Sequence, residues 1–410
     1  MQNKKFDSKL YNKSSNKFLE ILVLFVFSLS FFSCQAEQND KVDNQVYTNS
    51  NIDDSYFLLT QNNIANSRQN AITKTIASCS PAVVGINVTE VHKVQYQSRL
   101  EQFFAENFFG ERRPRKYEVK GLGSGFIISP DGYILTNHHV AGSASKIVVT
   151  LTNGEKYDAE IIGADMISDV CLLKIKGKNL PFIKFANSDN VIIGEWVIAF
   201  GNPFGLFDIN AKPTVTVGVI SNKGINFVQN ENTFGNQEYR VYKDMLQTDA
   251  AISSGNSGGP LVNALGEVVG MNTVIFSTAT SNSGAGSIGI GFSIPINRVK
   301  TIIDILKSGK KIERNTYTGI DAREITSEIS QYYKLSRNEG VFIYQMDRRS
   351  PALEAGIEPG DIIDKINNKK INRIDDFLIE IGDAMVGDKL KFEIIRGTSH
   401  HTYTITVKSL

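Results

Sequence analysis

The sequence predicts a mainly β fold built from two small barrels. From about residue 80 the chain consists of short apolar runs rich in Val and Ile, separated by turn residues. No long helical pattern lies between these runs, and this spacing indicates an antiparallel barrel or sandwich. The runs extend over roughly 220 residues, which suits two small barrels better than one.

Length and composition exclude several classes of protein. A chain of 410 residues predicts two or three domains, and its 41% hydrophobic content excludes a largely disordered or collagen-like chain. The 44 Lys and Arg residues balance 43 Asp and Glu residues, so no overall field exists to hold nucleic acid. Three cysteines without CxxC spacing and five histidines give no metal signature. We therefore expect no nucleic-acid partner, no metal and no cofactor.

The N-terminus has the pattern of an export signal. Several lysines precede a short apolar run, residues 21–32, which is too short for a typical membrane-spanning helix. The run ends in Ser33-Cys34-Gln35 and resembles a bacterial lipobox, in which the cysteine is lipidated. We expect residues 1–34 to be a signal peptide with a lipobox at Cys34, and the polar residues 35–70 to be a flexible tether. An uncleaved signal-anchor is the alternative, and both interpretations place the folded body outside the cytoplasm.

Turn and helix signals set the remaining elements. Ser129-Pro130-Asp131-Gly132 predicts a hairpin between the runs 125–128 and 133–136. Apolar residues at 296, 299, 302, 303 and 306 have helical spacing and predict a helix from Ile296 to Lys307. The sequence Ser308-Gly309-Lys310-Lys311 ends this helix, and we expect a domain boundary there.

Three segments carry the candidate chemistry. A serine flanked by glycines, in Gly255-Asn256-Ser257-Gly258-Gly259-Pro260, can occupy a tight turn beside backbone N–H groups that stabilise an oxyanion. His138 and His139 follow the hairpin strand, where neighbours point to opposite faces, so only one of them can enter a site. Asp169 directly precedes an apolar strand. Asp158 and Asp165 compete with it on spacing alone.

Together the segments resemble a known family. The order His, Asp, Ser within a β-rich chain is that of chymotrypsin-like proteases. The motifs TNHHVA, SDVCLLKI and QTDAAISSGNSGGPL, with GNPFG and GIGFSIP, closely resemble the HtrA (Deg) family of serine proteases over roughly residues 71–408. The resemblance implies a chymotrypsin-like double β-barrel protease domain at residues 71–308, followed by a small α/β PDZ domain at residues 316–408.

The resemblance also implies roles for single residues. His139 corresponds to the general base, Asp169 to the acid that orients it, and Ser257 to the nucleophile. The oxyanion hole corresponds to Gly255, Asn256 and Ser257. Asp249, close to the nucleophile in sequence, is expected to be structural.

Substrate preference should depend on residues near the nucleophile. In chymotrypsin-like folds, the residue six before the nucleophile lies at the base of the substrate pocket, and here it is Ala251, followed by Ile252. Ile275 is expected on the other wall. A neutral, apolar pocket leaves the charge of Lys or Arg uncompensated, so small or medium aliphatic side chains are the expected substrates.

Three further segments resemble regulatory parts of the family. Residues 95–120 carry two Phe pairs, at 103–104 and 108–109, and correspond to a long loop that covers the active site or reaches a neighbouring subunit. Residues 223–242 correspond to the family's sensor loop, with Arg240 as a possible substitute for its arginine. The PDZ loop that binds a peptide carboxylate corresponds to Tyr317, Thr318, Gly319 and Ile320.

The resemblance implies an exported, membrane-tethered serine endopeptidase of the bacterial periplasm. Its expected substrates are misfolded or unfolded envelope proteins, its expected regulators are C-terminal peptides bound to the PDZ domain, and its expected assembly is a homotrimer. Two alternatives stay open. One is a dedicated stress-signalling protease activated by C-terminal peptides, and the other is a chaperone-like binding protein in which hydrolysis is secondary.

Overall fold

The computed structural model describes residues 67–93, 116–202, 212–233, 236–253, 255–275, 289–310, 312–335, 337 and 339–410. The predicted signal peptide, Cys34, most of the tether and the two Phe pairs lie outside these residues. Within the described ranges, no helix is long and apolar enough to cross a membrane.

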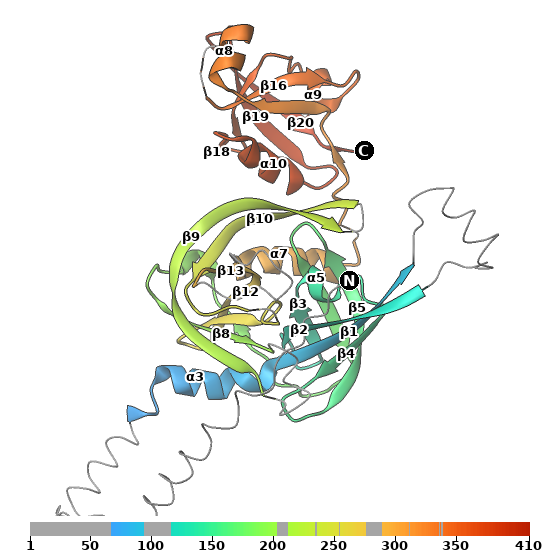
Figure 1. The fold of residues 1–410 in the computed structure, drawn as a ribbon, viewed down its shortest axis with the longest axis vertical. Helices are drawn as coiled ribbons and strands as arrows, with labels where there is room; N and C mark the ends of the chain where they lie inside the picture. Colours follow the sequence, from blue (N-terminus) through green and yellow to red (C-terminus); the bar gives the residue numbers. More distant parts are fainter. Residues whose placement is uncertain are drawn as a thin grey trace, which may run out of the picture. The chain divides into compact units, whose positions relative to one another are not determined.

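The first barrel confirms the predicted β architecture. It is preceded by a helix, α3 (Ala71–Cys79), and a 3-10 turn, η1 (Ser80–Ala82). Its six strands close in the order β1-β2-β3-β6-β5-β4 (Figure 1). Gly132 has a φ of +98°, which a tight turn favours, and Ile127 pairs with Ile134 across the predicted hairpin. The strands are β1 (Val83–Lys93), β2 (Lys116–Ile127), β3 (Tyr133–Thr136), β4 (Lys146–Thr150), β5 (Lys156–Asp165) and β6 (Val170–Ile175).

The second barrel is a seven-stranded sheet with the order β11-β8-β9-β10-β13-β12-β7. An additional pairing of β11 with β12 closes it. A short turn, η2 (Ser188–Asn190), precedes β8. The strands are β7 (Lys184–Phe185), β8 (Trp196–Gly201), β9 (Thr214–Thr233), β10 (Asn236–Thr248), β11 (Pro260–Asn263), β12 (Glu267–Ile275) and β13 (Gly291–Pro295).

The expectation of a loop at residues 223–242 is wrong. This segment lies in β9 and β10, which form the long curved pair of strands in Figure 1. The two strands pair in antiparallel register from Asn236 and Thr233 at the tip inward. Phe227 faces Tyr242 across the pair, with ring centroids 5.0 Å apart, and such cross-strand aromatic contacts stabilise strands despite the Asn and Gly content.

The helix α7 (Ile296–Lys307) has the predicted bounds. The five apolar positions that predicted it are its buried residues. One of them, Leu306, packs on Gly163 of β5, so α7 covers the first barrel. Gly309, with a φ of +71°, follows the end of the helix.

The C-terminal unit combines a six-stranded sheet with three helices. The sheet has the order β15-β16-β17-β19-β20, with β18 paired to β17, and β15 lies at its edge. A separate two-stranded sheet pairs β14 with β21. The elements are β14 (Thr316–Tyr317), β15 (Ile320–Glu324), α8 (Ser327–Tyr333), β16 (Val341–Met346), α9 (Pro351–Glu354), β17 (Ile362–Ile366), β18 (Lys369–Lys370), α10 (Ile374–Gly382), β19 (Lys389–Arg396), β20 (Ser399–Thr406) and β21 (Lys408–Ser409).

Candidate active site

His139 lies on a one-turn helix, α5 (His138–Ala141), and not on a strand as predicted. The helix forms directly after β3, where the carbonyl of Asn137 accepts hydrogen bonds from the backbone N–H groups of Val140 and Ala141. Successive residues of a helix differ in direction by about 100°, so the two histidines still point to different surroundings. The side chain of His139 is 31% exposed.

Asp169 is fully buried in the turn between β5 and β6. Its φ of +57° lies in the left-handed region, which Asp tolerates better than most residues. Its Oδ2 lies 2.9 Å from His139 Nδ1, and its Oδ1 accepts the backbone N–H of His139 at 3.0 Å. The hydroxyl of Thr273 donates to Oδ2 at 2.7 Å, and that of Tyr242 donates to it at 3.3 Å.

These contacts determine the ionisation of Asp169. Burial raises the pKa of this carboxyl, because a charged group loses its hydration. The charge and hydrogen bond of His139, the charge of Arg240 and the hydrogen bond from Thr273 lower the pKa further than burial raises it. The pKa of Asp169 therefore lies below its usual value, and the group is a carboxylate near neutral pH.

Ser257 occupies a glycine turn that contacts both barrels. Gly258 follows it with a φ of +84°, and a Cβ there would lie 2.2 Å from the carbonyl oxygen of Ser124, so only glycine fits. The backbone N–H of Ser124 on β2 donates to the Ser257 carbonyl at 3.0 Å. The hydroxyl of Ser257 donates to the carbonyl of Thr273 at 3.1 Å, and among the described residues it has no hydrogen bond to His139.

The two candidate catalytic groups share one cleft. It has a volume of about 210 Å³. His139 borders it from the first barrel, and Ser257 borders it from the second. The other lining residues are Val88, Glu90, Val119, Gly121, Leu122, Val140 and Gly255.

The turn before Ser257 separates the three expected oxyanion-hole residues. The backbone N–H of Asn256 donates to the Ser253 carbonyl at 3.0 Å, so it closes a turn. In the part of the chain that the structure describes, the N–H groups of Gly255 and Ser257 donate to no acceptor. Gly255 and Ser257, rather than Asn256, are therefore available to bind an oxyanion.

The three predicted pocket residues differ in accessibility. Ala251 is exposed, whereas Ile252 is fully buried in the second barrel and packs on Gly291. Ile275 pairs with Gly291 at the end of β12, and its side chain lies outside the described residues. Of the three, Ala251 alone is seen to be exposed, and it is not among the described residues that line the cleft. Asp249 accepts the backbone N–H of Val219 at 2.7 Å, consistent with its predicted structural role.

Sequence reasoning missed the residues that surround Asp169. Thr273 on β12, and Arg240 and Tyr242 on β10, contact this carboxylate from about 70–105 positions away. Their local sequence carries no catalytic motif, because the contacts arise only when the second barrel packs on the first. Only a prediction of the strand order in the two barrels could have placed these residues beside Asp169. Within the described ranges, no group of three or more His, Cys, Asp or Glu side chains is arranged to hold a metal ion.

The predicted PDZ loop borders a second, larger groove. Gly319 has a φ of +73°, and a Cβ there would lie 2.1 Å from Cβ of Ser350. The groove has a volume of about 470 Å³ and lies between this loop, β15 and α10. Its lining includes Tyr317, Thr318, Gly319 and Ile320 from the loop, and Phe377, Leu378 and Ile381 from α10.

Two family models match the chain. A model described as "Trypsin-like peptidase domain" matches residues 123–271, and one described as "PDZ domain" matches residues 316–407. The first match covers the double barrel from β3 to β11, and the second covers nearly all of the residues that line the groove. The protein is therefore a chymotrypsin-like serine endopeptidase with a C-terminal PDZ domain.

Curated relatives and solved structures narrow the class further. A "Probable periplasmic serine endoprotease DegP-like" of Chlamydia muridarum is 38% identical over 372 residues, which cover 86% of this chain and 71% of the relative. A protein of the same name from Chlamydia trachomatis is 41% identical, and the match covers 76% of this chain and 59% of that relative.

Two solved structures agree with these relatives. One, an "HtrA-type protease AlgW with decapeptide", has a TM-score of 0.59 and 30% identity, covering 82% of this chain and 97% of its own. A serine endoprotease from Yersinia pestis has a TM-score of 0.53 and 31% identity, with the same coverage of both chains. The chain belongs to the HtrA/DegP-like family of serine endoproteases.

Proposed function

We propose that this protein is an exported endopeptidase that cleaves misfolded or unfolded envelope proteins through His139, Asp169 and Ser257. The observation that carries the proposal is the pairing of the buried Asp169 carboxylate with the His139 imidazole, which borders the same cleft as Ser257. An imidazole oriented by a carboxylate can remove the proton of a serine hydroxyl near neutral pH. The two Chlamydia relatives are called periplasmic, which supports a periplasmic location.

The proposed reaction starts with a rotation of the Ser257 side chain. Its hydroxyl leaves the Thr273 carbonyl and donates to His139 Nε2, while His139 Nδ1–H donates to Asp169. Ser257 Oγ attacks the scissile carbonyl as His139 accepts its proton, and Asp169 stabilises the resulting imidazolium. The N–H groups of Gly255 and Ser257 bind the oxyanion. His139 then protonates the leaving amine, and water hydrolyses the acyl-enzyme by the same steps.

The substrate side chain before the cut is proposed to be small or medium and aliphatic. Ala251 is exposed and carries no charge. A Lys or Arg side chain would therefore enter without a counter-charge, which is unfavourable. Ile275 stays a proposed wall residue, and Ile252 supports the site from the barrel core.

The PDZ groove is proposed to bind C-terminal peptides. Backbone N–H groups of the loop Tyr317–Ile320 would hold the carboxylate, and the free edge of β15 would pair with the peptide. Phe377 and Ile381 give the groove an apolar wall for the last side chain. AlgW was solved with a decapeptide, which supports a peptide-binding role in this family.

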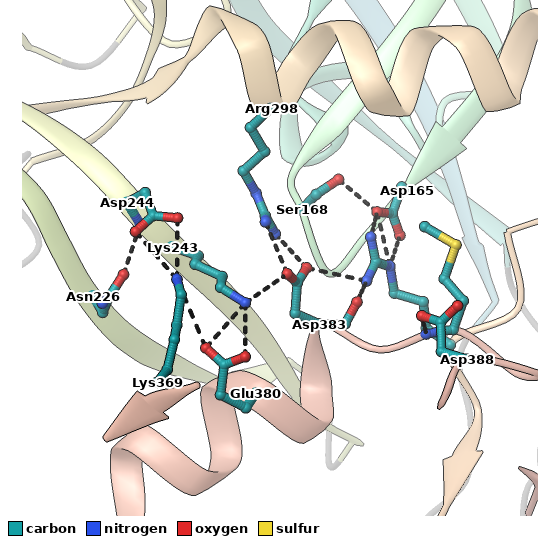
Figure 2. Close-up of polar contacts among 12 residues, drawn as sticks. Asp165, Ser168, Asn226, Lys243, Asp244, Arg298, Lys369, Glu380, Asp383 and Asp388 are labelled. Atoms are coloured by element: carbon teal, nitrogen blue, oxygen red, sulfur yellow. Dashed lines mark hydrogen bonds and ion pairs between the residues drawn. The ribbon is translucent and has the colours of Figure 1, made fainter. Parts of the chain in front are cut away.

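Contacts between α10 and the protease domain give peptide binding a route to the active site. Glu380 of α10 and Asp383, the residue that follows the helix, both pair with Lys243 of β10, at 3.0 and 3.3 Å. Figure 2 shows the Asp383 carboxylate between Lys243 and Arg298 of α7, with Arg298 at 2.6 Å. Ile379 packs in an apolar cluster with Ile167, two residues before Asp169, and with Val241.

A residue between α7 and β14 adds a second connection to the same region. Arg314 pairs with Asp165 at 2.7 Å and with Asp383 at 3.3 Å. Asp165 also accepts the hydroxyl of Ser168, so this network reaches the residue next to Asp169 (Figure 2). We propose that occupancy of the groove regulates hydrolysis through these contacts.

We further propose that Cys34 is lipidated and anchors a homotrimer to a membrane. The lipobox-like sequence at residues 33–35 supports the anchor. The trimer is supported by the resemblance to HtrA proteases with a single PDZ domain, which are usually trimeric. Palmitate label should follow the protein into the membrane fraction, and Cys34→Ser should persist as a slower-migrating precursor. Unchanged processing and an unlabelled wild type would instead support an uncleaved signal-anchor.

A dedicated signalling protease is the second candidate function. The hydrogen bond from Ser257 to the Thr273 carbonyl favours it, because a nucleophile held away from its base requires activation. Casein digestion by soluble protein starting at residue 71 separates the candidates, measured with and without free peptides that end in an apolar residue. Broad digestion supports quality control. Inactivity with every peptide supports a dedicated substrate, and suppression of aggregation by Ser257→Ala would support a chaperone role.

A further inference from the structure

A buried arginine lies beside the proposed catalytic acid. The side chain of Arg240 is 6% exposed, and its Nε lies 3.8 Å from Oδ1 of the fully buried Asp169. Arg240 and Tyr242 are two residues apart on β10, so both point to the same face of the strand. A buried charge is unfavourable unless an opposite charge is close, and Asp169 supplies that charge.

We propose that Arg240 is a positioning residue that sets how Asp169 holds His139. The proposal rests on the role of Asp169 proposed above. Oδ1 of Asp169 faces three groups, namely the backbone N–H of His139, its Nδ1 at 3.0 Å and the Arg240 guanidinium. Oδ2 lies 2.9 Å from the same Nδ1 and also accepts hydrogen bonds from Thr273 and Tyr242. Attraction of Oδ1 to Arg240 therefore restrains rotation of the carboxylate and keeps both oxygens directed at the imidazole.

The same guanidinium acts on the charge of the site. A carboxylate that already interacts with one cation stabilises a second cation, here the imidazolium of His139, less strongly. Arg240 thus weakens the attraction between the Asp169 carboxylate and an imidazolium, and we expect this to extend activity to lower pH. One residue is expected to raise turnover through geometry and to shift the pH dependence through charge.

The other titratable groups around the pair do not supply this charge. His138 is largely buried, and burial lowers its pKa and favours the neutral ring. Burial and the charge of Asp169 raise the pKa of Cys171 to about 12, so its thiol stays neutral. Asp165 is negative and is paired with Arg314. Among the described residues, the other titratable groups near the pair are the Tyr242 hydroxyl and Glu90, which lines the cleft with His139.

Arg240→Gln in the full-length protein tests the proposal, because Gln keeps a polar side chain of similar length and removes the charge. The pH dependence of kcat and kcat/KM is measured on a chromogenic peptide with an aliphatic residue before the cut. Fluorophosphonate titration gives the concentration of active sites. We expect kcat to fall about tenfold or more with KM changed by less than about twofold, since the loss is in alignment of the base. We also expect the acid limb of kcat/KM to move up by about one pH unit.

Two further variants separate charge from packing. Arg240→Lys keeps the charge and should restore most of the turnover and the position of the acid limb. Tyr242→Phe removes a neutral hydrogen bond to the same carboxylate, so it should lower kcat without moving the limb. If Arg240→Gln does not fold, Arg240→Met, whose stem can keep the apolar contacts, is measured in its place.

Three results would overturn the proposal. The first is wild-type kcat and an unmoved acid limb in Arg240→Gln. The second is a loss of activity that matches the loss of titratable active sites at every pH, which would mean a purely structural role. The third is a limb that moves equally in Arg240→Lys. A wild-type protein that neither reacts with fluorophosphonate nor cleaves peptides would instead refute the triad assignment itself.

Discussion

The two halves of the candidate active site differ in how completely they are formed. In the first barrel, both oxygens of Asp169 have hydrogen-bond donors and His139 is oriented at 2.9 Å from Oδ2. In the second barrel, the Ser257 hydroxyl is bonded to the Thr273 carbonyl, away from the base. The acid–base half is therefore built by the fold, whereas the nucleophile half requires a local rearrangement.

The backbone explains this difference. His139 and Asp169 are attached to strands of a closed barrel, and the carboxylate is fully buried. Ser257 lies between Gly255 and Gly258, which both have positive φ angles. Glycine changes between such backbone conformations without steric strain, so the turn can reorient at little expense in energy.

Removal of the nucleophile is expected to have the largest effect on activity. Ser257→Ala should lower kcat/KM by about 10⁴–10⁶, because no other described residue that lines the cleft carries a hydroxyl or thiol. Fluorophosphonate labelling should disappear, and the thermal unfolding midpoint should stay near that of the wild type. Labelling that persists in Ser257→Ala would show a different nucleophile.

Removing the base tests the half that is already formed. His139→Ala should lower kcat/KM by about 10⁴, since it removes the general base while Asp169 stays in place. His138→Ala is the matched control on the same turn of helix, and we expect a change of less than about threefold. Full activity in His139→Ala with His138 present would show that the other histidine is the base.

The ion pairs around α10 can be tested through the pH dependence of the free energy of unfolding. Burial raises the pKa of Asp383, but the hydrogen bond and charge of Arg298 and the charges of Lys243 and Arg314 lower it well below its usual range. A folded-state pKa below the unfolded value of 3.8 stabilises the fold at pH values above 3.8. This stabilisation is lost as the pH falls through the folded-state pKa.

Asp383→Asn should therefore lower the free energy of unfolding by about 3 kcal/mol at pH 7, because it leaves buried cations without a partner. Urea unfolding between pH 7 and pH 2 should show the difference from the wild type shrinking below about pH 4. Asp375→Asn, in the first turn of the same helix, is the control and should change stability by less than about 1 kcal/mol. A difference that does not depend on pH would contradict the assigned ion pairs.

The smallest expected effect is activation by peptides, which tests whether the nucleophile half is the part that rearranges. Free peptides with an apolar C-terminal residue should raise kcat/KM by several-fold, a coupling free energy of about 1–3 kcal/mol. If the nucleophile half is the part that rearranges, the same peptides should accelerate fluorophosphonate labelling of Ser257. Amidated peptides should have no effect, because the loop Tyr317–Ile320 loses the carboxylate.

Deletion of residues 316–410 is the control for this coupling. The truncated protein should have a constant rate or none. Equal stimulation by acid and amide peptides would contradict the assigned binding loop. Stimulation that survives the deletion would contradict coupling through the PDZ domain.

The sequence predicted the elements that depend on local patterns. Short β-type runs and the turn at residues 129–132 predicted the barrels, and five apolar positions predicted α7 with its bounds. The family motifs identified the residues that the structure brings together at the cleft. These features are local because hydrophobic spacing and turn chemistry act over a few residues.

The sequence failed where distant contacts determine the structure. The strands at residues 223–242 depend on cross-strand packing such as Phe227 on Tyr242. The one-turn helix at His138 is a separate case, because its contacts with the Asn137 carbonyl are local and carry no sequence signal that was used. The approach of Arg240 to Asp169 depends on how the two barrels meet. Propensity is a weak guide in such cases, because tertiary contacts outweigh it.

The alternation of side chains along β10 limits how this protein can change during evolution. Arg240 and Tyr242 face the carboxylate of Asp169, while Val241 and Lys243, which alternate with them, contact α10. A one-residue insertion or deletion that shifts this stretch would exchange the two faces and remove both sets of contacts at once. Changes in the length of the β9–β10 hairpin are therefore expected at its tip, or in pairs of residues, so that lineages can lengthen the hairpin without altering its base.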